Sequence, residues 1–272
     1  MFRTPLMEYS NFFLKCEHHW PGGSYKARGV ETFLASLPRD TKRIRCLSAG
    51  NMARTLALLA KPRGIVVEAL VPESIPEVKR AKLEGLGVQL TLVPFEQLWK
   101  EVDTPSPTPF PLLHPVDSPA LLEGYGRIAQ EILEQAKGIS EVIIPIGVGG
   151  LSLGLARVLA PKVRVVLVEN ATNAPYVSKR AIPRKPSWVD AIGTPYTLER
   201  VREALLPLVS EVRAVSPRAA FEAGKRLYEM KGELVEGAAA VALAAATKDS
   251  IVILTGGNID SKIYSSGFAE EN

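Results

Sequence analysis

Short apolar runs alternate with longer amphipathic segments along most of the chain. A short apolar run bounded by turn residues indicates a buried strand, and an amphipathic stretch of ten or more residues indicates a helix. Helices that follow strands one by one connect parallel strands, so the pattern predicts an α/β protein. The expected strands are 12–14, 45–47, 66–70, 89–93, 142–146, 163–168 and 251–254. The expected helices are 26–37, 51–61, 76–86, 118–135, 151–159, 217–231 and 237–246.

The composition is that of a globular protein with a substantial core. Hydrophobic residues make up 46% and charged residues 23% of the 272 positions, which is ordinary for such a protein. No apolar run reaches the roughly 18 residues of a membrane span, and the first residues lack the apolar core of a signal peptide. The net charge of +4 is mild, and the basic residues are dispersed. We therefore expect neither a membrane nor a nucleic-acid partner.

Two cysteines, Cys16 and Cys46, are too few for a disulfide framework, which favours a reducing cytoplasm. The segment 16–19, Cys-Glu-His-His, suggests a metal site, but no second cluster of Cys and His completes a tetrahedral set, and the only other histidine is His114. We therefore expect no metal. The 21 prolines against four glutamines and six asparagines favour a thermophilic source.

A lysine at a glycine-rich turn is the first candidate for chemistry. Lys26 follows the Gly-Gly-Ser-Tyr segment 22–25 and opens the expected helix 26–37. Desolvation and the positive end of a helix favour the neutral amine, which can act as a nucleophile. Taken alone, Lys26 is more simply interpreted as a surface lysine, so its significance depends on the other segments.

A second candidate is the Gly-Val-Gly-Gly loop, residues 147–150, between an expected strand and an expected helix. Such a loop presents backbone N–H groups and a helix N-terminus to an anion, and glycine lacks the Cβ that would block its approach. The loop also begins the pattern of a dinucleotide site, with Glu169 ending the next strand, but Ser152 stands at the third glycine position. A phosphate-bearing cofactor is preferred, a dinucleotide is the alternative, and a turn without a ligand stays open.

Four segments occur in the order found in one enzyme family. They are 21–29 (PGGSYKARG), 48–51 (SAGN), 147–151 (GVGGL) and 255–258 (TGGN). They resemble the lysine segment, the asparagine loop, the phosphate loop and the C-terminal segment of the fold-type II pyridoxal-phosphate-dependent enzymes. Within that family the resemblance is closest to the serine/threonine ammonia-lyases, or dehydratases, and to the serine racemase-like group.

The resemblance implies an architecture. Its members have two open, mostly parallel twisted-sheet domains, as in the tryptophan synthase β-like enzymes, with pyridoxal 5'-phosphate between them. Here it implies a large cofactor-binding domain from residues 1–35 plus 125–272 and a smaller inserted α/β domain from residues 36–124. A homodimer and a small amino-acid substrate are the expected partners.

The resemblance also implies roles for single residues. Lys26 would anchor the cofactor and act as the catalytic base, with Tyr25 and Ala191 against the two faces of the cofactor ring. Asn51 would bond the phenolic oxygen of the cofactor, and Thr255 its ring nitrogen. Without the resemblance, Tyr25 reads as a core aromatic, Asn51 as a helix cap and Thr255 as an ordinary strand-end residue.

Two loops would hold the charged groups. The resemblance implies that the cofactor phosphate is bound by Gly147, Val148, Gly149, Gly150 and Leu151. It implies that the substrate carboxylate is bound by Ser48, Ala49, Gly50 and Asn51, which suits the N-terminus of a helix. Glu236 either caps a helix or borders the cofactor ring.

The implied reaction is β-elimination, in which L-serine or L-threonine gives a 2-oxo acid and ammonia. A serine racemase, a β-replacement enzyme and a threonine-synthase-like enzyme are alternatives on the same scaffold. A catalytically silent pyridoxal-phosphate-binding protein and an NAD-dependent dehydrogenase represent other classes. Two departures guide the choice: Ala49 stands where racemases of the family carry a serine, and Glu169 is followed by Asn173 where the metal-binding members carry an acid.

Overall fold

The computed structural model describes residues 3–180, 187–189 and 191–265 and divides into two compact units. The first unit comprises Met1–Tyr25 and Gly126–Asn272, and the second comprises Lys26–Tyr125. Both units are α/β, with mostly parallel sheets, as the alternation of runs predicts. The domain limits expected from the family resemblance, 35/36 and 124/125, stay a prediction.

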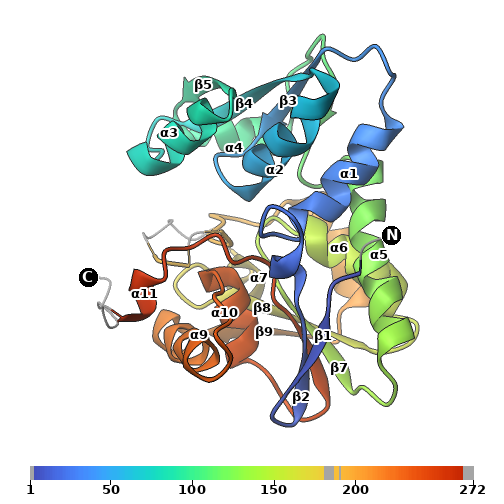
Figure 1. The fold of residues 1–272 in the computed structure, drawn as a ribbon. Helices are drawn as coiled ribbons and strands as arrows, with labels where there is room; N and C mark the ends of the chain where they lie inside the picture. The colour runs from blue at the N-terminus through green and yellow to red at the C-terminus, as the bar shows by residue number, and fades with distance from the viewer. Residues whose placement is uncertain (1–2, 181–186, 190, 266–272) are drawn as a thin grey trace. The chain divides into compact units, whose positions relative to one another are not determined.

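The first unit is built on a six-stranded sheet (Figure 1). In sheet order its strands are β1 (Leu6–Tyr9), β2 (Phe12–Lys15), β10 (Ser250–Ile253), β7 (Glu141–Pro145), β8 (Arg164–Asn170) and β9 (Glu211–Val215). Only β1 and β2 pair antiparallel, as a hairpin, and the other neighbours are parallel. The N-terminal hairpin forms one edge of the sheet, and β10, from near residue 250, lies between β2 of that hairpin and β7. Segments far apart in sequence are therefore neighbours in the sheet.

Helices cover both faces of this sheet. They are α5 (Pro119–Gln135), α6 (Gly150–Leu159), α7 (Pro175–Ser178), α8 (Glu199–Leu205), α9 (Pro217–Lys231), α10 (Gly237–Ala244) and α11 (Lys262–Ser265). Short 3-10 turns, η1 (Glu17–His19) and η3 (Leu206–Leu208), complete the unit. Helix α5 begins within residues of the second unit and continues into the first.

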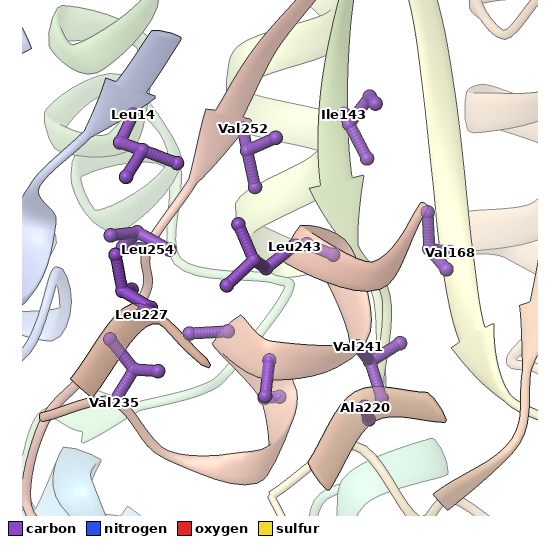
Figure 2. Close-up of a cluster of buried hydrophobic side chains, with 14 of the residues drawn as sticks. Leu14, Ile143, Val168, Ala220, Leu227, Val235, Val241, Leu243, Val252 and Leu254 are labelled. Atoms are coloured by element: carbon purple, nitrogen blue, oxygen red, sulfur yellow. The ribbon is translucent and has the colours of Figure 1, made fainter. Parts of the chain in front are cut away.

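A cluster of buried hydrophobic side chains lies between the sheet and helices α9 and α10 (Figure 2). One row of paired residues crosses four strands and consists of Leu14, Val252, Ile143 and Val166. Helix α10 is apolar on every side and lies between α9 and the sheet, so its alanines let both neighbours approach closely. This burial holds β7 and β10 in place, and the segments 147–151 and 255–258 follow the ends of these two strands.

The second unit has a four-stranded, all-parallel sheet. In sheet order its strands are β5 (Gln89–Val93), β4 (Val66–Pro72), β3 (Arg43–Leu47) and β6 (Leu112–Leu113). Its helices are α1 (Lys26–Ser36), α2 (Asn51–Ala60), α3 (Glu77–Gly85) and α4 (Phe95–Asp103), with a 3-10 turn, η2 (Lys61–Arg63), after α2. Helices α1 and α2 pack against each other.

All seven expected strands and all seven expected helices are present, with ends shifted by only a few residues. The sequence reasoning missed β1, β6, β9, α4, α7, α8 and α11. Most of these are short or lie at a sheet edge, where half-exposed residues weaken the apolar signal. Within the described residues, no helix has the length and hydropathy needed to cross a membrane.

Candidate active site

The Gly-Gly-Ser turn is held by the C-terminal segment of the first unit. Gly22 and Gly23 adopt positive φ values of 96° and 73°, a conformation that favours glycine. The N–H of Tyr25 donates to the carbonyl of Thr255 at 3.0 Å, and the N–H of Gly257 donates to the carbonyl of Gly23 at 3.0 Å. The structure thus brings together two motifs, 21–29 and 255–258, that lie some 230 residues apart in sequence.

The same contact explains two of the glycines. A Cβ on Gly23 would come within 2.5 Å of Asn258 Oδ1, while the Asn258 amide donates to the carbonyls of Gly22 and Gly23. A Cβ on Gly256 would come within 2.7 Å of Glu236 Oε2. Substitution at either glycine would therefore push the two segments apart.

Glu236 acts as a clamp on this segment. Its Oε1 accepts the N–H of Asn258 at 3.0 Å, and its own N–H donates to the carbonyl of Gly256 at 2.8 Å. Glu236 also occupies the N-cap position of α10, though its side chain makes no capping bond there. These bonds give Glu236 a structural role and keep Thr255, which is buried at the end of β10, in a fixed backbone position.

The glycine loop follows β7 and leads into α6. Gly149 is the N-cap of α6 and has a φ of 104°. A Cβ on Gly149 would come within 2.6 Å of Val201 Cγ1 and 3.2 Å of Tyr176 Oη. A Cβ on Gly147 would come within 3.2 Å of Ile192 Cα and 3.5 Å of the Ala191 carbonyl oxygen. The loop is tightly enclosed, and Ala191 lies directly beside it.

The loop fits an anion such as the phosphate of pyridoxal 5'-phosphate. The first N–H groups of a helix have no partner within the helix, and the helix N-terminus is positive. In the first turn of α6, the buried hydroxyl of Ser152 has no hydrogen-bond partner in the described parts of the chain. The buried hydroxyl of Tyr176, beside Gly149, likewise has none among the described residues. Unsatisfied donors in a loop built of glycines are the chemistry that a phosphate requires.

In the second unit, Lys26 is the first residue of α1 and is half-buried. Its Nζ lies 5.8 Å from the centroid of the Tyr125 ring, within reach of a cation–π contact. Helix α1 crosses the start of α5 closely, because a Cβ on Gly29 would meet Leu121 Cδ1 at 2.5 Å. A Cβ on Gly124 would overlap the carbonyl of Arg28. The last glycine of the lysine motif therefore fixes the helix on which Lys26 stands.

The Ser48–Asn51 loop connects β3 to α2 within the same unit. Gly50 is the N-cap of α2, and its N–H donates to Ser48 Oγ at 3.2 Å. Asn51 is the first residue of the helix, so it does not occupy the cap position that the plain interpretation gave it. Ser48, Ala49 and Asn51 are half-buried and Gly50 is exposed. In contrast to the glycine loop, no atom of the described residues lies within 4 Å of a Cβ built on Gly50.

Glu169, at the end of β8, binds its own chain. Its two carboxylate oxygens accept the N–H groups of Tyr176 at 3.0 Å and Val177 at 2.8 Å, at the start of α7. Burial raises the pKa of Glu169 to about 7, although these two hydrogen bonds act in the opposite direction. Asn173 is buried and bridges to Asn170. The carboxylate of Glu169 therefore satisfies the first N–H groups of α7.

The third histidine, His114, is held by hydrogen bonds to its own neighbourhood in the chain. His114 Nε2 lies 2.9 Å from the carbonyl of Val102, and its Nδ1 accepts the N–H of Asp117 at 3.0 Å. Sequence reasoning overlooked Tyr125, beside Lys26, and Tyr176, beside the glycine loop, and it took Ser152 only as a departure from the dinucleotide pattern. Of these only Ser152 carried a signal, since it stands at the third position of a helix that was expected to bind an anion.

Comparisons with known proteins match this geometry to one group of enzymes. Residues 1–256 match the sequence profile of a family described as pyridoxal-phosphate dependent enzyme. The chain is 30% identical to an L-threonine ammonia-lyase of Geobacter sulfurreducens, over 97% of this chain and 73% of that protein. It is 27% identical to a serine racemase of Oryza sativa subsp. indica, over 91% of this chain and 81% of that protein.

Solved structures give the same group. A threonine deaminase from T.th. is 27% identical, with a TM-score of 0.80 over 95% of this chain and 94% of that chain. Maize serine racemase is 24% identical, with a TM-score of 0.82 over 97% of this chain and 91% of that chain. Both lyases and racemases therefore share this fold.

Proposed function

This chain belongs to the family of pyridoxal-phosphate-dependent enzymes, and we propose that it eliminates ammonia from L-serine, L-threonine or both. The products are ammonia and a 2-oxo acid, pyruvate from serine and 2-oxobutanoate from threonine. The similarity to the L-threonine ammonia-lyase of Geobacter sulfurreducens supports the reaction class. The choice of elimination over racemisation is argued below from single residues of this chain.

Lys26 is proposed as the anchor of the cofactor and as the base that takes the proton from the substrate Cα. When bound, pyridoxal 5'-phosphate supplies an electron sink for the charge that this proton transfer leaves behind. Positioned general bases contribute about 10²–10⁴-fold to such steps. The close crossing of α1 and α5 at Gly29 supports this role, because it holds the start of α1, and with it Lys26, in place.

Three other groups are proposed to orient the reactants. The N–H groups of 147–151, at the positive end of α6, would hold the cofactor phosphate and keep it dianionic. Thr255, whose backbone position is fixed by the clamp of Glu236, would offer a neutral hydroxyl to the ring nitrogen. A neutral partner protonates that nitrogen less than a carboxylate does, which suits prompt loss of the β-hydroxyl.

Elimination over racemisation rests on one observation, the alanine at position 49. Lys26 can serve only one face of the substrate Cα, and racemisation needs a second proton donor on the opposite face. In the racemases that the loop resembles, a serine supplies that donor. Ala49 has no proton to give, and the hydroxyl of the neighbouring Ser48 is directed to its own loop, where it accepts the N–H of Gly50.

The test measures two products from L-serine with the holoenzyme. Pyruvate and ammonia should form together, and D-serine should form at least tenfold more slowly. D-serine appearing as fast as pyruvate would overturn the proposal in favour of the racemase. The variant Ala49→Ser should raise the D-serine share. Absorbance of bound cofactor without turnover of serine or threonine would instead mark a silent binding protein.

A further inference from the structure

Three metal-binding side chains converge outside the candidate active site. His18 Nε2 lies 2.7 Å and His19 Nε2 lies 2.8 Å from the same carboxylate oxygen, Glu233 Oε2. The three ligand atoms all lie within 4.8 Å of one another. The two imidazole rings stand side by side, with centroids 4.3 Å apart. Two neighbouring histidines on a 3-10 turn therefore point their Nε2 atoms at one oxygen.

We propose that His18, His19 and Glu233 form a binding site for Zn²⁺. Two imidazoles and one carboxylate are a donor set that Zn²⁺ uses in proteins, with a fourth position left for water. At bond lengths of about 2.0–2.2 Å, tetrahedral donors stand about 3.3 Å apart. The present spacing of 2.7 and 2.8 Å needs to open by only about half an ångström to admit the ion.

The surroundings support an ion with an open fourth position. The side chain of His18 is 5% exposed, that of Glu233 19% and that of His19 37%, so the cluster is closed on one side and reachable from the other. The second carboxylate oxygen, Glu233 Oε1, accepts no hydrogen bond from the described residues, which leaves it available to the ion.

The donor chemistry also sets the selectivity. Imidazole nitrogen suits Zn²⁺ and its transition-metal neighbours, whereas Mg²⁺ and Ca²⁺ prefer several oxygen ligands. The buried Nδ1 of His18 has no hydrogen-bond partner within the described chain. A ligating histidine normally donates from its second nitrogen, and loss of such a partner costs about 10–100-fold in affinity. The site should therefore bind Zn²⁺ less tightly than a fully supported structural site.

The location gives the site a consequence within the first unit. The turn η1 precedes the Gly-Gly-Ser segment, and the N–H of His18 donates to the carbonyl of Leu254 at 3.0 Å. Glu233 stands in the strap 232–236 that runs from α9 to the clamp residue Glu236. A Cβ on Gly257 would meet both Leu234 O, at 2.6 Å, and His18 Cβ, at 3.5 Å. An ion here would tie the strap and the turn around the segment that carries Thr255.

Equilibrium dialysis of chelator-stripped holoenzyme against Zn²⁺ tests the proposal. Wild type should bind one Zn²⁺ per chain at this site, and Glu233→Gln should weaken that binding at least tenfold. Glu229→Gln, which changes an exposed glutamate of α9, is the matched control and should bind as wild type does. A large excess of Mg²⁺ or Ca²⁺ should not displace the ion. Equal uptake by wild type and Glu233→Gln, or no uptake by either, would overturn the proposal and leave a hydrogen-bonded cluster only.

A second variant keeps the test decisive if Glu233→Gln folds poorly. His19 is the most exposed of the three ligands, so His19→Asn should leave folding intact while removing one ligand. With Co²⁺ as the probe, wild type should show the visible d–d bands of a tetrahedral site, and His19→Asn should lose them. Bands of equal intensity in both proteins would sink the assignment. Neither readout measures turnover, so the outcome is independent of the proposed elimination reaction.

Discussion

The two units present the same local design at their strand-to-helix junctions, but they build it differently. In the first unit, the junction from β7 to α6 is enclosed, and added side-chain atoms at Gly147 or Gly149 would meet other residues within 3.2 Å. In the second unit, the junction from β3 to α2 is open around Gly50. The first requires glycine for packing and for a φ of 104°, whereas the second does not.

A third junction shows how a chain satisfies a helix N-terminus by itself. At the end of β8, the carboxylate of Glu169 binds the first N–H groups of α7. In the proposed mechanism the other two junctions hold external anions instead: the cofactor phosphate at the enclosed junction of the first unit, and the substrate carboxylate at the open junction of the second.

The largest effect is expected at the proposed anchor of the cofactor. Lys26→Ala should abolish turnover, because it removes the proposed attachment point and the proposed base together. The loss should exceed the roughly 10²–10⁴-fold of a base alone. The measurement is 2-oxo acid release, with Lys61→Ala, an exposed lysine of η2, as the control that should keep full activity.

Borohydride reduction of the holoenzyme followed by peptide mapping checks the same residue without a variant. The label should appear at Lys26. A label at any other lysine would show that Lys26 is not the attachment point of the cofactor.

The enclosed junction should not tolerate a methyl group. Gly149→Ala forces an alanine into a left-handed conformation and against Val201, so we expect a loss of about 2–5 kcal/mol of stability. Cofactor binding should fall with it. Urea unfolding and titration with pyridoxal 5'-phosphate provide the two readouts.

Gly138 is the matched control for that variant. Its φ is 70°, and the described residues leave the space around its Cβ position open. Gly138→Ala should cost only the conformational part, about 1–2 kcal/mol, and leave cofactor binding unchanged. Equal losses in the two variants would show that enclosure contributes nothing at the phosphate loop.

At the open junction from β3 to α2, a methyl group should affect activity more than stability. Gly50→Ala should change stability by less than about 0.5 kcal/mol, because nothing in the described chain meets the new methyl group. If the substrate carboxylate binds at this loop, kcat/KM should nevertheless fall about tenfold or more, because the methyl group would occupy part of the open space and weaken the charged hydrogen bonds of the carboxylate. Gly85→Ala, in equally open surroundings on α3, should leave kcat/KM unchanged and alter stability by at most about 1 kcal/mol, the difference in helix propensity between the two residues.

The junction from β8 to α7, where Glu169 binds the first N–H groups of the helix, should make stability depend on pH. The pKa of Glu169 is raised to about 7 in the folded chain from 4.5, so between these values the folded state binds more protons than the unfolded state. Stability must then fall as pH rises through this window. Relative to Glu169→Gln, wild type should lose stability from about pH 4.5 to about pH 7 and stay level above it. Urea unfolding at several pH values would show parallel curves if this is wrong.

The smallest expected effect is that of metal removal on turnover. Both oxygens of Glu169 are bound to α7, and no second carboxylate occurs in the segment 170–175 that follows it. Exhaustive chelation should therefore change serine turnover by less than about twofold. A large loss restored by Mg²⁺ would mean that this junction binds a cation and is not satisfied by its own chain.

The sequence predicted most of the helices and strands because long apolar and amphipathic periods survive in it. It also predicted which loops meet helix N-termini. It could not predict the pairing of Gly23 with Asn258, or the position of Glu236, because contacts across some 20–230 residues leave no local pattern. Glu233 was missed for the same reason, since it lies 214 residues from His19. Edge strands such as β9 were missed because their half-exposed residues resemble loops.

The hydrogen bonds between 22–25 and 255–258 have a consequence for biosynthesis. The ribosome makes the lysine segment some 230 residues before its partners Thr255 and Gly257 and before the strand β10, which joins β2 to β7. Domains generally fold as units while the chain is extended from its N-terminus. The six-stranded sheet of this enzyme must instead wait, with its first hairpin unattached, until about 250 residues have been added. Until the residues after β10 have been synthesised, the lysine turn lacks the backbone hydrogen bonds to Thr255 and Gly257 that hold it.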